Sequence, residues 1–150
     1  MPNIHPEVIK FQNELATPLY AYVYSADPAV KQTRVYIAGK VTGLAHDEVV
    51  EKFAAAEKVL TDAGFDVVNP VSATTHLPEG TDWQKYMRIT MCLMLTCDVV
   101  VMLPDYLTSK GALAELRTAE ALGMQIDFYP EFNMVPDYKH FNTPAHDTSN

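Results

Sequence analysis

Residues 98–103 read Asp-Val-Val-Val-Met-Leu, and a proline follows directly. After Asp98 every side chain in this run is apolar, so it lacks the alternation of a strand that exposes one face to water. A continuous apolar run of this length indicates a strand buried on both faces, as in a parallel sheet that helices cover on both sides. We therefore expect further strands, and the helices that cover them, on either side of this run.

Two more strands are predicted upstream. Residues 35–38 form the apolar run Val-Tyr-Ile-Ala, residues 65–68 form a second apolar run, and each ends at a turn. Between these runs, Asp47 is the predicted N-cap of a helix and Gly64 marks its end. The apolar face of this helix recurs at helical spacing, at Val49, Phe53, Ala56 and Leu60.

The same alternation of helix and strand continues downstream. Asp82 is the predicted N-cap of a helix over residues 83–96, residues 111–122 form a further helix, and residues 125–129 form a last short strand. Strands that alternate with helices of this length indicate a parallel sheet. The sequence therefore predicts an α/β fold, a Rossmann-like (flavodoxin-like) three-layer sandwich with a sheet of about four to five strands.

The chain divides into three parts on this pattern. Residues 1–33 are a predicted N-terminal extension, in which residues 7–15 suit a short helix and residues 19–24 alternate as in an edge strand. Residues 34–130 form the predicted domain. Residues 131–150 are a predicted C-terminal tail, which either wraps a partner subunit or stays mobile.

Charge and hydropathy exclude some partners. The chain has 150 residues, which fits one domain. Its formal net charge of -8 disfavours binding along a nucleic-acid polymer, because that affinity comes mainly from Lys and Arg. No apolar run reaches the ~20 residues that span a bilayer, and no basic segment precedes an apolar stretch, so we expect a cytoplasmic protein without membrane contact.

Cysteines and histidines give no sign of a metal or a disulfide. Cys92 and Cys97 share an apolar helical stretch, and we expect both to be buried, reduced thiols. The histidines have no ligand spacing, so we expect no metal and no cofactor; they are His5, His46, His76, His140 and His146.

Ligands of an open parallel sheet bind outside the carboxyl ends of its strands. Three loops meet there, over residues 39–43, 69–80 and 104–111. The first loop is Gly39-Lys40-Val41-Thr42-Gly43, which lacks the P-loop pattern and is either a phosphate contact or an ordinary tight turn. Asn69 and His76 in the second loop, and Asp105 and Tyr106 in the third, are further candidates by position.

The third loop leads into Ser109-Lys110-Gly111, and Glu115 follows about one turn into the helix. Ser109 is a good N-cap, which alone explains its presence. Glu115 is either a catalytic carboxylate or a solvated residue that favours the helix dipole.

These residues together resemble the nucleoside 2-deoxyribosyltransferase-like superfamily, most closely a phage and bacterial branch of small uncharacterised proteins. The 2'-deoxynucleoside 5'-phosphate N-hydrolases are more distant relatives. The resemblance covers roughly residues 34–129. It depends on the order and spacing of Tyr36-Ile37-Ala38-Gly39, Thr42-Gly43, Asn69-Pro70, Trp83, Tyr86-Met87-Arg88, Cys97-Asp98, Leu103-Pro104 and Ser109-x-Gly111-x-x-x-Glu115.

The resemblance implies roles for individual residues. It implies that Glu115 is a nucleophile on C1' of the sugar, as in retaining glycosidases, and that Tyr36 lies near it. It implies that Ser109 and Gly111 bind a 5'-phosphate at the helix N-terminus. It also implies a homo-oligomer, a dimer or larger, in which a neighbour completes the pocket.

The sequence departs from the family pattern at two positions. Thr90 stands where the family often has an aspartate near the base or the sugar, and a retaining scheme needs a group that holds or protonates the leaving base. Asp82 and Asp105 are replacements that are nearby in sequence. Lys40 stands where many relatives have Pro or Ser, and is either a phosphate cation or a solvated loop lysine.

Two functions follow as hypotheses. The first is cleavage of the N-glycosidic bond of a nucleoside 5'-monophosphate, or deoxyribosyl transfer, with Glu115 as nucleophile. The second is a non-catalytic nucleotide-binding or sequestering module with the same pocket, which Thr90 favours. A phosphoribohydrolase is a weaker alternative, because its Pro-Gly-Gly-x-Gly-Thr-x-x-Glu segment is absent.

Overall fold

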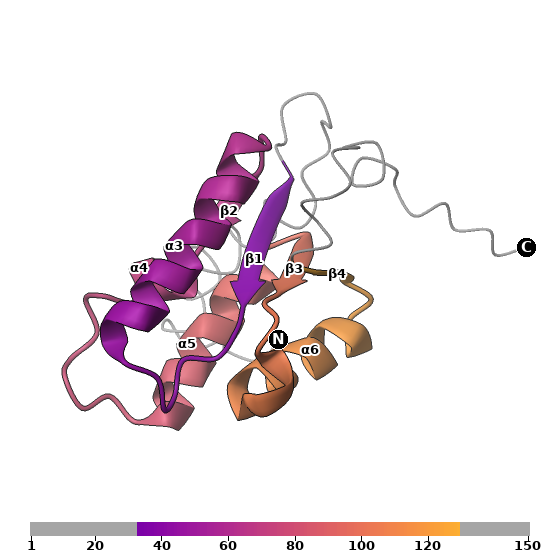
Figure 1. The fold of residues 1–150 in the computed structure, drawn as a ribbon. Coiled ribbons are helices and arrows are strands. Elements are labelled where there is room, and N and C mark those ends of the chain that lie inside the picture. Colours follow the sequence, from indigo (N-terminus) through magenta and orange to yellow (C-terminus); the bar gives the residue numbers. More distant parts are fainter. Residues whose placement is uncertain (1–32, 130–150) are drawn as a thin grey trace, which may run out of the picture. The chain divides into compact units, whose positions relative to one another are not determined.

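The computed structural model describes residues 33–129, which contain the predicted α/β domain up to its last strand (Figure 1). The helix predicted over residues 7–15, the strand over 19–24 and the tail from residue 131 lie outside the described residues. Within the described residues, no helix is long and apolar enough to cross a membrane.

Four parallel strands form the sheet. They are β1 (Arg34–Ala38), β2 (Asp66–Val68), β3 (Val99–Met102) and β4 (Gln125–Phe128). Their order is β2-β1-β3-β4, and every neighbouring pair is parallel. The predicted parallel sheet is therefore confirmed, and its two central strands are buried apolar runs of the sequence.

Helices connect the strands, with their bounds close to those predicted. The helical elements are α3 (His46–Asp62), α4 (Pro70–Ala73), α5 (Trp83–Leu95), the 3-10 turn η2 (Tyr106–Thr108) and α6 (Lys110–Ala121). Helix α4 was not predicted; Asn69 caps it and Pro70 occupies its first position, where a missing N–H costs nothing.

The sheet is covered on both faces. Successive side chains of β1 point to opposite faces, so Val35 and Ile37 pack in one core with Phe53 of α3, while Tyr36 and Ala38 pack in the other. This second core includes side chains of α5 and α6. The described residues thus form three layers, as the sequence predicted.

Two predictions about individual residues are wrong. The N-cap of α3 is Ala45, and Asp47 lies within the first turn. Its carboxylate still interacts favourably with the positive end of the helix dipole. Cys92 is exposed because it lies on the outer face of α5, whereas Cys97 is buried as expected. The helix ends that Asp82 and Gly64 predicted are confirmed: Asp82 accepts a hydrogen bond from the Lys85 N–H, and Gly64 has a φ of +96° after α3.

Candidate functional site

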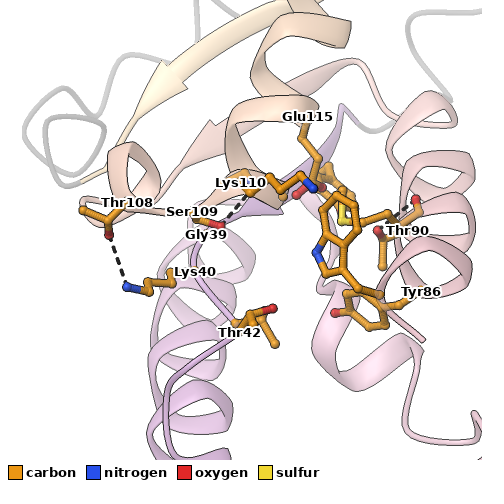
Figure 2. A pocket seen from close by; sticks show the side chains of 15 residues that line it. Gly39, Lys40, Thr42, Tyr86, Thr90, Thr108, Ser109, Lys110 and Glu115 are labelled. Carbon is orange, nitrogen blue, oxygen red and sulfur yellow. Dashed lines mark hydrogen bonds between the residues drawn. The ribbon is translucent and has the colours of Figure 1, made fainter. Parts of the chain in front are cut away.

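The pocket lies at the switch point of the sheet. The chain leaves β1 toward β2 on one side and returns to β3 on the other, so the loops after β1 and β3 diverge and leave a crevice. A cavity of about 510 Å³ opens there (Figure 2). Its walls come from β1 with the loop after it, from one face of α5, and from the N-terminal half of α6.

Glu115 lies in this pocket and is buried. Its relative exposure is 5%, so it is not the solvated first-turn residue that was one alternative. One carboxylate oxygen is hydrogen-bonded to Tyr36, and Oε2 is buried without a partner among the described residues. Burial raises the pKa of Glu115 from 4.5 to about 7, and the hydrogen bond with Tyr36 opposes this rise.

Tyr36 supports Glu115 from the middle strand. It is fully buried in β1, and burial together with the charge of Glu115 raises the pKa of its phenol well above 10.0. Tyr36 therefore stays protonated, and its hydroxyl donates a hydrogen bond to the Glu115 carboxylate. Its hydroxyl also contacts Thr90, which is buried and donates a hydrogen bond to the Met87 carbonyl at 3.3 Å.

Glu115 is the only carboxylate among the described residues that line the pocket. Asp82 is exposed, and its carboxylate caps the N-terminus of α5. Asp105 forms an ion pair with Lys52 at 2.5 Å. Neither residue thus supplies the pocket with a carboxylate that could replace the aspartate expected at the position of Thr90.

Asp105 and Lys52 instead fix the loop after β1. The Lys40 N–H donates to Asp105 Oδ1 at 3.0 Å, and Lys52 Nζ donates to the Lys40 carbonyl at 2.6 Å. Both backbone groups of Lys40 are thereby held by two side chains that are themselves paired. We call Lys52 and Asp105 the loop clamp, because they fix the position of one pocket wall.

The N-terminus of α6 forms the opposite wall. Ser109 Oγ accepts a hydrogen bond from the Ala112 N–H at 3.1 Å, so the predicted N-cap is confirmed. A Cβ on Gly111 would lie 3.1 Å from Met87 Sδ and 3.8 Å from Trp83 Nε1. The glycine thus permits close packing of α5 on α6, in addition to leaving its backbone bare toward the pocket.

The pocket brings together most of the residues predicted for the site, from segments far apart in sequence. Figure 2 shows Lys40 and Thr42 on one side, and Ser109 and Lys110 on the α6 side, with Lys40 Nζ 3.4 Å from Thr108 Oγ1. The predicted residues that line it are Tyr36, Gly39, Lys40, Thr42, Thr90, Ser109, Gly111 and Glu115.

The other predicted residues do not line the pocket, for separate reasons. Asn69 does not line the pocket; its amide oxygen caps α4, and its amide nitrogen donates a hydrogen bond to Glu57 Oε2 at 2.7 Å. Tyr106 packs on the ring of Phe128, with a centroid distance of 5.5 Å. Gly43 lies in the exposed part of its turn, His76 is exposed, and Asp105 belongs to the loop clamp.

Helix α5 contributes a wall of which only Thr90 was predicted from the sequence. Trp83, Tyr86, Met87 and Thr90 all line the pocket. Their spacing of three, four and seven residues places them on one helix face, and this pattern is the signal that could have found them. Lys110, whose ammonium lies over the Trp83 ring, was also missed.

Within residues 33–129, no group of three or more His, Cys, Asp or Glu side chains could hold a metal ion. The lining of the pocket offers one buried carboxylate, two tyrosines, two lysines and the N–H groups at a helix N-terminus.

Fold and site define an α/β protein with a switch-point pocket built around a buried glutamate. The chain belongs to the family described as a domain of unknown function, DUF4406, whose model matches residues 33–128. The fold also matches a solved 2-deoxyribosyltransferase from Bacillus psychrosaccharolyticus, with a TM-score of 0.52 and 19% identity over 64% of this chain and 71% of that chain. The fold expected from the resemblance to the nucleoside 2-deoxyribosyltransferase-like superfamily is thus confirmed. No curated protein matches the chain.

Proposed function

We propose that this protein cleaves the N-glycosidic bond of a nucleoside 5'-monophosphate, or transfers its deoxyribosyl group, with Glu115 as the nucleophile. The observation that carries this proposal is the carboxylate oxygen Oε2 of Glu115. It is buried in the pocket without a partner among the described residues, although burying an unpaired carboxylate oxygen is costly. A substrate carbon that becomes positively charged as its bond breaks would give this oxygen a partner.

The chemistry follows that of a retaining glycosidase. Glu115 Oε2 forms a bond to C1' of the sugar while the bond from C1' to the base nitrogen breaks, and the base leaves with the electron pair of that bond and takes up a proton. Water then attacks the glycosyl ester and releases the sugar phosphate and free Glu115. If a second base attacks instead of water, the outcome is transfer.

The N-terminus of α6 suits the 5'-phosphate. Backbone N–H groups at a helix N-terminus and the positive end of the helix dipole stabilise an anion. Ser109 and Gly111 lie at this end, with the ammonium groups of Lys40 and Lys110 beside the same pocket. These groups give a strongly acidic chain a local positive site for one phosphate.

The pKa of Glu115 sets the expected pH dependence. A nucleophilic carboxylate must be ionised, and its pKa is raised to about 7. The rate of base release should therefore rise as the pH increases through about 7, because protonated Glu115 cannot attack C1'.

A non-catalytic nucleotide-binding module is the second candidate. The observation that favours it is that Glu115 is the only carboxylate among the described pocket residues, with Thr90 beside Tyr36 where a second carboxylate would assist the leaving base. Such a module would bind nucleotides and leave them intact.

One experiment separates these functions. Each nucleoside 5'-monophosphate is incubated with the protein, free base is measured by chromatography, and binding is measured by calorimetry on the same panel. Glu115→Gln should abolish base release and keep binding, whereas Glu120→Gln, an exposed residue of the same helix, should leave both unchanged. Glu115→Gln activity within tenfold of wild type would rule out the nucleophile. Binding without base release would favour the module, and Thr90→Asp should then restore some turnover.

A further inference from the structure

One face of helix α5 presents two aromatic side chains to the pocket. Trp83 and Tyr86 are each half-buried and line the cavity, although neither lies in the two hydrophobic core clusters. Large aromatic side chains that line a cavity without joining the core offer their ring faces to a ligand.

A cation lies over the ring face of Trp83. Lys110 Nζ lies 4.4 Å from the centroid of the Trp83 ring, well within the ~6 Å range of a cation–π contact. Lys110 is exposed and forms no ion pair with any described residue, so this contact is its one strong interaction in residues 33–129. In Figure 2, Lys110 extends from the α6 side toward α5, across the pocket.

Tyr86 is less free than Trp83 to receive a ligand. Its hydroxyl is hydrogen-bonded to Thr74, which fixes the ring by its polar end. The indole of Trp83 has no hydrogen-bond partner among the described residues, and its edge lies beside Gly111, where a Cβ would stand 3.8 Å from Nε1. Its face is covered by a flexible, solvated ammonium, which a flat ligand can displace.

From these contacts we propose that the heterocyclic base of the ligand stacks on Trp83, which we call the stacking platform. When the ligand binds, the Lys110 ammonium leaves the indole face and contacts the ligand's phosphate, a movement we call the exchange. This inference rests on the proposed function for the class of ligand. The exchange is local, because Lys110 follows Ser109 directly at the N-terminus of α6. Aromatic stacking tolerates every base, so the platform predicts affinity for several nucleotides with modest discrimination between them.

The platform is tested by binding to the Glu115→Gln variant, so that no turnover disturbs the measurement. In that background, Trp83→Leu should weaken the binding of nucleoside monophosphates roughly ten- to hundredfold. Trp83→Phe, which keeps an aromatic face, should restore most of the affinity. Deoxyribose 5-phosphate, which has no base, should bind to both Trp83 variants at least as tightly as to the Glu115→Gln protein.

The exchange is tested with Lys110→Met. This variant should weaken the binding of monophosphates and of deoxyribose 5-phosphate about tenfold, whereas nucleosides should bind at least as tightly as before. Lys85→Met, an exposed lysine on α5 outside the pocket lining, is the matched control and should change neither.

Fluorescence gives a second readout that does not depend on how well Trp83→Leu folds. Trp83 is the single tryptophan of the chain, so the intrinsic emission reports on this ring alone. In Lys110→Met, nucleosides should change the emission and deoxyribose 5-phosphate should not.

The outcomes separate this inference from the proposed function. If wild type releases base while Trp83→Leu binds nucleotides normally, the platform is wrong and the function stands. If no base is released but nucleotides bind and depend on Trp83, the platform stands and the enzyme proposal fails. If bases, nucleosides and nucleotides all fail to bind or to alter Trp83 emission, the platform is overturned.

Discussion

Replacement of Glu115 by Gln should change how the stability of the fold depends on pH. In the folded chain the pKa of Glu115 is raised to about 7 by burial, whereas in the unfolded chain it returns to about 4.5. Between these values the folded state holds a proton that the unfolded state has lost. The free energy of unfolding of the wild type should therefore fall as the pH rises from about 4.5 to about 7.

The size of this effect follows from the two pKa values. One pH unit corresponds to about 1.4 kcal/mol, so the rise from 4.5 to about 7 corresponds to about 3 kcal/mol of lost stability across that window. Glutamine does not ionise and lacks this contribution. Its buried amide also has an unpaired N–H₂ group, which costs about 1–3 kcal/mol at every pH. Only the pH-dependent difference between the two proteins therefore measures the ionisation of Glu115.

The assay is urea unfolding of wild type and Glu115→Gln at several pH values from 4 to 9, followed by circular dichroism. The stability of the wild type relative to the variant should decline by about 3 kcal/mol with rising pH and level off above pH 7. Glu120→Gln controls for loss of an exposed charge on the same helix. Parallel stability curves for wild type and Glu115→Gln would show that Glu115 is ionised at its ordinary pKa, and would refute the burial argument.

Three further predictions concern the neighbours of Glu115. Tyr36→Phe removes a hydrogen bond that lowers the pKa of Glu115, so the midpoint of the pH–rate profile should move upward from about 7. Gly39→Ala should lower the free energy of unfolding by about 1–3 kcal/mol in chemical denaturation, because the new Cβ would lie 2.7 Å from Leu103 Cδ1 and 3.0 Å from its Cβ. Lys52→Met opens the loop clamp and should weaken nucleotide binding in calorimetry several-fold, with a stability loss of about 1 kcal/mol.

Each of these three predictions has a clear contrary result. A midpoint for Tyr36→Phe at or below that of wild type would mean that the phenol does not stabilise the carboxylate. An unchanged stability of Gly39→Ala would mean that Leu103 has room to shift. If Lys52→Met bound nucleotides as wild type does, the loop after β1 would hold its shape without the clamp, whereas Lys58→Met on the exposed face of α3 should have no effect in either case.

The sheet was predictable from the sequence because its two central strands are buried on both faces. Such strands must be apolar throughout, and the runs 35–38 and 99–102 have that composition with turns at their ends. The helix starts at Asp82 and Ser109 were predictable for a similar reason, since one side-chain oxygen satisfies an N–H that the helix leaves free. Ala45, which caps α3 without a side-chain bond, gives no such signal.

The pocket was only partly predictable, because local sequence does not show which tertiary partner a polar side chain finds. Asp105 lies in a strand-end loop as a ligand-binding residue would, but Lys52 from a distant helix pairs with it. The burial of Glu115 follows from the packing of α6 against β1, which periodicity alone left open. Trp83 lies at a helix start that was predicted. It lines the pocket only because α6 packs beside it, which the local sequence does not show.

The energetics of Glu115 bear on why a carboxylate stands at this position. Above pH 7 its burial costs the fold about 3 kcal/mol, which a neutral side chain at the same place would not cost. Groups held in a destabilised protonation state inside a cavity are found chiefly where a site uses them. Tyr36 recovers part of this cost: its own pKa is so high that it always donates, which supports one carboxylate oxygen and leaves Oε2 without a partner. A purely structural carboxylate would be expected to satisfy both oxygens, so the unpaired one is the feature that any account of this pocket must explain.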